Sequence, residues 1–321
     1  MIGCGYVVHA DGTVAECGVA GAPQHSNDDK ALVWVHLDGR DPESRAWLEK
    51  TDLPRAALEA LTAEETRPRA DVIHAGAILN LRGLATQGVV APDALVSIRL
   101  WAEKGRVISV SFFPLAAVQP VRAAMEAGRI RDPGDLITAI AVTITEALDP
   151  DVAALGDTLD EFESDMLRPR RGLGVRARIG KARSRAILYR RFVAPQRAAL
   201  ERLAGLEVDW LEDDDRSHVR VAADRFARMA EELEAIRERA ALMHEQLTDL
   251  RAELVEQRAL LVSVVALIFL PLTFITGLLG MNVDGIPYAH HPHAFWWVTG
   301  FCVAVAVGVT GYFVMLRWFR E

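Results

Sequence analysis

The residues best placed to do chemistry form the tripeptide Gly280-Met281-Asn282, which ends a long apolar run near the C-terminus. If the run is a helix, its last carbonyl groups lack partners and carry partial negative charge. Asn282 adds neutral carboxamide oxygens, which can hold a hydrated cation without binding it too tightly for release. The tripeptide therefore predicts the cation-binding mouth of a pore. Gly and Asn are also common helix C-caps, so a capping role alone stays open.

Helical spacing places a stripe of smaller residues behind Asn282 on one face of the same run. The stripe consists of Gly277, Thr273, Leu270, Ala266, Val262 with Ser263, Ala259 and Glu256. In a ring of identical helices it would line a water-filled channel, with Leu270 and Val262 as apolar constrictions. Small residues also permit close helix packing in a bilayer, which is the alternative. Pro271 removes one backbone hydrogen bond and should bend the helix.

Two uncharged segments, about 259–281 and 294–316, must position these residues. Each has roughly the 20 apolar residues needed to cross a bilayer as a helix. Basic residues flank the pair on both outer sides: Arg251, Arg258, Arg317 and Arg320. The loop between the segments, 283–293, has no Lys or Arg, so the positive-inside rule puts both termini in the cytoplasm and the loop outside. No signal sequence opens the chain, so about the first 250 residues are expected to stay in the cytoplasm.

The composition limits the class of protein. The 321 residues are 51% hydrophobic and 25% charged with a net charge of -8, which permits a cytoplasmic domain plus a membrane part and does not favour nucleic acid as a partner. Cys4, Cys17 and Cys302 lack paired spacing, so we expect neither a disulfide framework nor a cysteine metal motif. No nucleophile-base motif or phosphate loop marks the soluble part as an enzyme, and we expect no cofactor.

The cytoplasmic part divides into two regions by its patterning. Before residue 134, β-rich runs alternate with turns and helical pieces, which predicts a mixed α/β domain over 1–134. The clearest runs are Ala31–Leu37, Ala75–Leu81, Leu95–Trp101 and Arg106–Phe112. Residues 135–258 are predicted to be helical, with interruptions near Arg168–Gly174 and Leu206–Asp215, and 259–321 form the membrane domain. The chain is therefore predicted to be an α+β membrane protein.

A heptad pattern gives the strongest periodic signal. Apolar residues recur at alternating spacings of three and four: Val219, Ala222, Phe226, Met229, Leu233, Ile236, Ala240, Met243, Leu247, Leu250 and Leu254. This predicts a supercoiled helix that packs against copies or neighbours. No Pro or Gly separates Leu254 from the first span, so we expect one helix from near Ser217 to Met281, about 95 Å long. It would carry movement of the soluble domain to the pore, or would only hold an oligomer together.

The chain resembles the CorA family of divalent-cation transporters, whose hallmark Gly-Met-Asn stands at 280–282, and more closely its zinc-transporting ZntB branch. The resemblance covers nearly the whole chain through the motifs Trp34–Asp38, Glu64–Arg69, Leu79–Gly83, Ser97–Trp101, Val107–Val110, Ile236–Ala240 and Gly285–Pro287. It implies a funnel-shaped homopentamer in a bacterial inner membrane, in which five first spans line the pore. The Asn282 ring would then meet the ion at the periplasmic entrance.

The resemblance implies transport of a divalent cation, with Zn²⁺ the closest match, by a proton-linked or a passive route. A Mg²⁺, Co²⁺ or Ni²⁺ channel is the alternative within the family. A membrane-anchored coiled-coil scaffold with a soluble binding domain is the alternative from another class.

Several residues near the predicted pore have two interpretations. Asp284 and Glu256 depart from the ZntB pattern, which usually has Gly and often Asn at these positions. If either faces the axis, five carboxylates would add a cation site, but the cost of unpaired charge leaves outward rotation equally open. The loop histidines His290, His291 and His293 are suitable zinc ligands, although solvated residues or interfacial anchors are the alternative. Zinc capture by them would weaken in acid.

Opposite charges gather in two runs. Arg168–Arg197 contains many basic residues and no acid, and Glu207–Asp215 is strongly acidic. We expect the two runs to face each other, across a helical hairpin or between subunits. The alternatives are a basic run that lines the funnel or touches anionic lipid, and an acidic run that senses cations.

Overall fold

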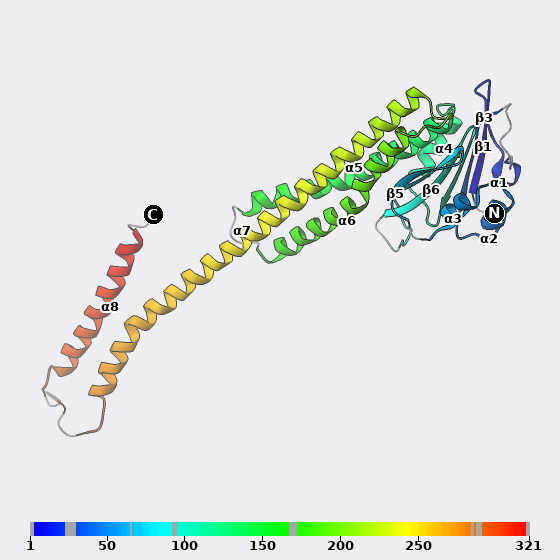
Figure 1. Cartoon of the computed structure of the whole chain (residues 1–321). Coiled ribbons are helices and arrows are strands. Elements are labelled where there is room, and N and C mark those ends of the chain that lie inside the picture. Colours follow the sequence, from blue (N-terminus) through cyan, green and yellow to red (C-terminus); the bar gives the residue numbers. More distant parts are fainter. Residues whose placement is uncertain are drawn as a thin grey trace. The chain divides into compact units, whose positions relative to one another are not determined.

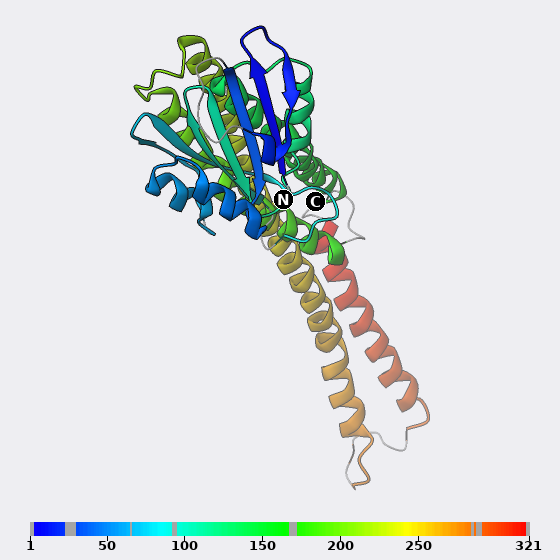
Figure 2. The ribbon, with the colours of Figure 1, turned by 90° about the vertical axis from the view of Figure 1, so that its right-hand side faces the viewer.

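The computed structural model of the chain describes residues 3–22, 30–64, 66–91, 95–166, 172–283, 286 and 291–318. These residues belong to two compact units, Met1–His244 and Glu245–Glu321, and each unit is considered by itself. Figure 1 labels the helices and four of the strands, β1, β3, β5 and β6, and Figure 2 shows the same ribbon after a quarter turn.

A mixed seven-stranded sheet forms the N-terminal part of the first unit, with the strand order β2-β1-β3-β7-β6-β5-β4. Its strands are β1 (Gly3–His9), β2 (Val14–Glu16), β3 (Lys30–Asp38), β4 (Arg69–Ile73), β5 (Gly76–Leu84), β6 (Leu95–Glu103) and β7 (Arg106–Ser111). Only the β3–β7 pair is parallel, and the other neighbours are antiparallel. The four predicted runs correspond to β3, β5, β6 and β7, so the predicted mixed α/β character of the N-terminal part is confirmed.

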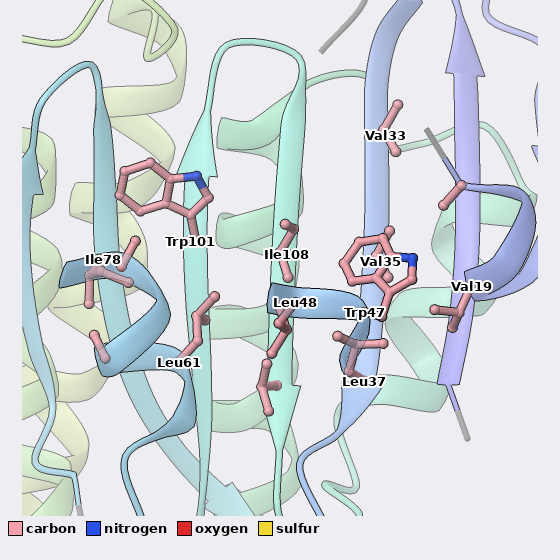
Figure 3. Close-up of a cluster of buried hydrophobic side chains, with 14 of the residues drawn as sticks. Val19, Val33, Val35, Leu37, Trp47, Leu48, Leu61, Ile78, Trp101 and Ile108 are labelled. Carbon is pink, nitrogen blue, oxygen red and sulfur yellow. The ribbon is translucent and has the colours of Figure 1, made fainter. Parts of the chain in front are cut away.

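Three short helices, α1 (Gly18–Gly21), α2 (Pro42–Lys50) and α3 (Arg55–Thr62), contribute to a core on one face of the sheet. α2 begins where the Asp41 side chain accepts a hydrogen bond from the Glu43 amide, with proline at the first helical position. Trp47 and Leu48 of α2 and Leu61 of α3 lie over strand residues such as Ile108 and Trp101 (Figure 3). This buried cluster anchors the helices to the sheet.

The helical part of the first unit contains α4 (Val118–Glu126), α5 (Pro133–Met166), α6 (Gly172–Ala204) and the start of α7 (Asp213–Leu279). α5 and α6 contact β5, and α6 also contacts β4. The heptad positions from Val219 to Met243 are all buried in this unit. Beyond them, Leu250 and Leu254 are 42% and 48% exposed. The predicted single long helix is confirmed, and its heptad face is covered by its own chain only in the first half.

The second unit contains the C-terminal part of α7 and the helix α8 (Ala294–Trp318). Both helices are long and apolar enough to cross a membrane, and their most apolar windows contain no buried residue. Pro271 lies inside α7, and α7 ends at Leu279. The two predicted apolar helices are therefore present at the predicted positions.

The basic residues of α6 find partners on α5 and α7. The ion pairs with these two helices are Arg178–Glu161 at 3.3 Å, Arg185–Asp151 at 3.6 Å and Arg190–Glu234 at 3.0 Å. Near the end of α6, Arg197 pairs with Glu201 and Arg202 with Asp71 of β4. Among the described residues, Glu207–Asp215 supplies no partner to the basic run, so the predicted facing of the two runs within one chain is wrong. The reason is that α5 and α7 place closer carboxylates beside α6. Pairing between subunits stays a prediction.

Candidate cation pathway

The tripeptide follows the last turn of α7. The Gly280 amide donates to the Thr276 carbonyl oxygen at 3.0 Å and extends the helical hydrogen bonds by one residue. A Cβ atom at Gly280 would itself lie 3.0 Å from that oxygen, so glycine suits this close approach. Met281 and Asn282 come after the helix, and both are exposed. The Asn282 carboxamide is therefore presented beyond the negative end of the α7 dipole.

The predicted stripe lies on the open side of α7. Its members Glu256, Val262, Ala266, Leu270, Thr273 and Gly277 are all exposed. The partly covered side chains in the same stretch are Val264, Ile268, Leu272 and Ile275. At 100° per residue the centres of these two sets lie roughly 180° apart around the helix. The stripe thus faces away from the side of α7 that its own chain covers.

The hydroxyl groups near the stripe differ in what they bind. Ser263 Oγ donates to the Ala259 carbonyl at 2.9 Å, and Thr276 Oγ1 donates to the Leu272 carbonyl at 2.9 Å. The Thr273 hydroxyl makes no hydrogen bond with any residue that the structure describes. Thr273 is therefore the stripe residue whose hydroxyl is available to water or to a hydrated ion.

Two of the three loop histidines come together at the start of α8. The His291 and His293 rings have centroids 5.9 Å apart, and the His293 amide donates to His291 Nδ1 at 3.3 Å. His291 also stacks on Trp297 with a centroid distance of 4.6 Å. The stacking is typical of an interfacial anchor, and the paired rings also suit a metal. His290 and Asp284 lie outside the described residues.

One carboxylate cluster in the first unit was not predicted from the sequence. Side-chain oxygens of Asp132, Asp135 and Asp215 all lie within 4.8 Å of one another. Burial, reinforced by the other two carboxylates, raises the pKa of Asp215 to about 6. Asp132 accepts from the Asp135 amide at 2.8 Å, and Asp215 accepts from the Glu212 amide at 2.9 Å. Through these hydrogen bonds Asp132 caps the N-terminus of α5 and Asp215 caps the N-terminus of α7. Two features of the sequence could have indicated these caps: the aspartate before Pro133 and the run Asp213–Asp215.

The chain is similar to known proteins over both its N-terminal unit and its apolar C-terminal helices. Residues 29–317 match the family model described as CorA-like Mg²⁺ transporter protein. The chain is similar to the zinc transport protein ZntB of Pectobacterium carotovorum, with 30% identity over 287 residues, 89% of this chain and 87% of the relative. It is also 33% identical over 289 residues to the divalent cation transporter CmaX of Pseudomonas aeruginosa, with 89% and 87% covered. The solved structure of full-length CmaX matches 98% of each chain with a TM-score of 0.82 and 32% identity.

Proposed function

The chain belongs to the CorA family of divalent-cation transporters, and we propose that it carries Zn²⁺ across a bacterial inner membrane through a pore of five copies. Family membership supports the transport of divalent cations. The similarity to ZntB supports zinc as the cation. The observation that carries the proposal is that the exposed Asn282 follows the uncharged C-terminal segment of α7, whose small-residue stripe is uncovered in the single chain.

In the proposed pore, the stripe of α7 lines the channel. Five Asn282 carboxamides would meet the hydrated ion at the entrance formed with Gly280 and Met281, and Thr273 hydroxyls would replace part of its outer water further along. Leu270 and Val262 would form apolar constrictions, with Ala266 and Gly277 giving wider parts between them. Uncharged oxygen ligands favour passage because they hold the ion weakly.

The remaining residues would act at the two ends of the pore. Glu256 at the cytoplasmic end and Asp284 at the outer end would add rings of negative charge, and His290, His291 and His293 would assist zinc capture outside. Residues 1–134 and 135–258 would lie in the cytoplasm, and 259–321 would form the membrane domain with a periplasmic loop. Both termini would be cytoplasmic.

A flux measurement tests the proposal. The purified full chain is reconstituted in liposomes that hold a zinc-sensitive dye, Zn²⁺ is added outside, and the flux is compared with and without an inward proton gradient. Asn282→Ala should lower the flux by about tenfold or more, because the first ring of oxygen ligands is lost. The matched control Gln246→Ala removes an exposed carboxamide elsewhere on α7 and should leave the flux unchanged. Unchanged flux in Asn282→Ala would contradict the pore and favour the scaffold.

A second candidate is a passive channel for Mg²⁺, Co²⁺ or Ni²⁺. The matching family model is described as a Mg²⁺ transporter, and this description favours the candidate. The same liposomes with a magnesium-sensitive dye separate the two. Magnesium flux that is indifferent to the gradient, without zinc flux, would replace zinc as the proposed cargo. Zinc flux that the gradient enhances would support proton-linked zinc transport.

A further inference from the structure

Charge is segregated by helix in the first unit. The segment that forms α5 has nine acidic and no basic residues, and the segment that forms α6 has nine basic residues and one acid. Ion pairs within the chain use only part of this charge, because Arg178 and Arg185 reach α5 and Arg190 reaches α7. Each helix therefore keeps charge of one sign that its own chain does not neutralise.

Part of the unneutralised basic charge lies on the outer face of α6. Lys181, Ser184, Leu188 and Arg191 recur at spacings of three and four, on the side opposite the buried residues of this helix. We call these four residues the basic ridge. Lys181 and Arg191 form no ion pair with any described residue, although the Arg191 guanidinium packs over the Phe192 ring, 5.5 Å from its centroid. The ridge is exposed except for Leu188, which is half-buried.

The complementary charge lies in a groove between α5 and α7. The groove has a volume of about 300 Å³, and its lining includes Ile236 and Arg239, whose guanidinium pairs with Asp160 at 2.6 Å. The rest of the lining consists of three small residues and three acids, which we call the acidic groove: Ala153, Gly156, Ala235, Asp157, Asp160 and Glu232. A Cβ atom added at Gly156 would meet no other atom within 4 Å, so the floor is open. Asp157 and Glu232 form no ion pair with any described residue.

The two surfaces lie on different sides of α5. Lys181, Ser184 and Leu188 line a hollow with Leu155 and Thr158 on one side, whereas the groove lies between α5 and α7 on the other. α5, α6 and α7 run side by side in the first unit (Figure 1), and a groove between two helices of such a bundle lies opposite the third helix. The basic ridge and the acidic groove thus point in different directions. A contact between different surfaces of identical chains is heterologous, and repeated contacts of this kind close into a ring when the rotation permits.

We propose that the basic ridge of one copy docks into the acidic groove of the next copy. The inference rests on the ring assembly of the proposed function, and it names the cytoplasmic contact that holds the ring. Small floor residues allow a helix ridge to approach closely, and the opposite charges on ridge and groove fix the order and direction of the subunits. Lys181 and Arg191 would pair with Asp157 and Glu232 of the neighbouring copy.

A directed disulfide tests this contact on the full chain. In a variant with the three native cysteines replaced by alanine, Ser184→Cys is combined with Gly156→Cys, and the protein is oxidised in detergent. We expect a ladder of disulfide-linked oligomers on a non-reducing gel, ending in the covalent ring. Neither single cysteine should give a ladder, because the contact joins different residues. The control pair Ser184→Cys with Arg45→Cys, an exposed site on α2, should also give none.

Charge reversal provides the second measurement. Asp157→Lys should lower the yield of cross-linked oligomer by about tenfold, because like charges would then face each other. Adding Lys181→Glu and Arg191→Glu in the same chain should restore the yield. The control Glu59→Lys on α3 makes the same change of charge at an exposed position and should have no effect.

The outcomes separate this inference from the proposed function. A pentameric mass in native mass spectrometry without any ladder would overturn the ridge-to-groove contact and leave the pore proposal intact. A monomeric mass for the cysteine-free parent and for the natural chain would count against both. A ladder that the charge reversal does not weaken would overturn the electrostatic part of the inference.

Discussion

At the scale of single residues, local hydrogen bonds decide which polar groups of α7 are available to an ion. A threonine in a helix often donates its hydroxyl to the carbonyl four residues earlier, and Thr276 does so. Thr273 does not, although it lies only one turn away. The sequence marks both as hydroxyl residues near the stripe, but it does not show which hydroxyl is free, because that depends on the side-chain rotamer.

This difference makes a matched pair of substitutions informative. Thr273→Val keeps the shape of the side chain and removes the free hydroxyl, so it should lower cation flux severalfold if the stripe lines the pore. Thr276→Val removes a hydroxyl that is already bound to the backbone and should change the flux little. Liposome flux assays on both variants would measure this. Equal losses in the two variants would contradict the assignment of Thr273 to the pore wall.

Asp215 makes a pH-dependent contribution to stability. Burial raises its pKa from 3.8 to about 6, so the folded chain binds this proton more readily than the unfolded chain. The stabilisation that comes from this tighter proton binding is fully present below about pH 3.8 and is lost as the pH rises through about 6. Asp215→Asn removes the buried charge and keeps an acceptor for the Glu212 amide. It should raise the Tm at pH 7.5 by roughly 2–4 °C and reduce the gain on acidification to pH 5.

Thermal unfolding of the full chain, followed by circular dichroism at both pH values, would measure this effect. Asp214→Asn is the matched control, because the neighbouring Asp214 side chain is 85% exposed. Similar shifts for the two variants would show that burial of Asp215 is not the cause.

At the scale of elements, the sequence predicts the helices better than their partners. Uncharged spans and heptads identify α7 and α8 closely, because both signals extend over many residues. The edge strand β4 was not predicted, since its five residues include Arg69 and Asp71 and show little alternation. The heptad pattern marks the apolar face of α7 throughout, but it does not reveal that α5 and α6 cover that face only to Met243. Coverage depends on the length of the neighbouring helices.

The two halves of the heptad stripe should therefore respond differently to the same substitution. Leu233→Ala removes a fully buried side chain and should lower the free energy of unfolding by about 3 kcal/mol, through lost burial and a cavity. Leu254→Ala affects a side chain that is 48% exposed in the single chain and should cost less than about 1 kcal/mol. Denaturant unfolding of the full chain in detergent would measure both. A larger loss for Leu254→Ala would show that copies of the chain cover the second half.

At the scale of the whole molecule, charge patterning bears on two properties, the pairing of charged segments and the orientation of the two spans in a membrane. The sequence predicted that the basic and acidic runs meet, within the chain or between subunits. Within the chain, the basic run pairs with α5 and α7 instead. Charge patterning alone does not predict a partner, because any carboxylate brought near by the fold competes for the same arginine. Orientation has a clearer physical signal, since the arginines lie outside the pair of spans and the loop between them has none.

This charge asymmetry predicts the accessibility of two introduced cysteines. In the cysteine-free chain, His291→Cys should react with a membrane-impermeant maleimide in intact bacterial cells, because the loop is expected to face the periplasm. Arg45→Cys on the exposed side of α2 should react only after the inner membrane is permeabilised, because the first unit is expected in the cytoplasm. The cysteine-free parent should not react in either condition. The reverse labelling pattern would place the Asn282 ring at the cytoplasmic end of the pore, so the ion would meet Glu256 before it met the carboxamides.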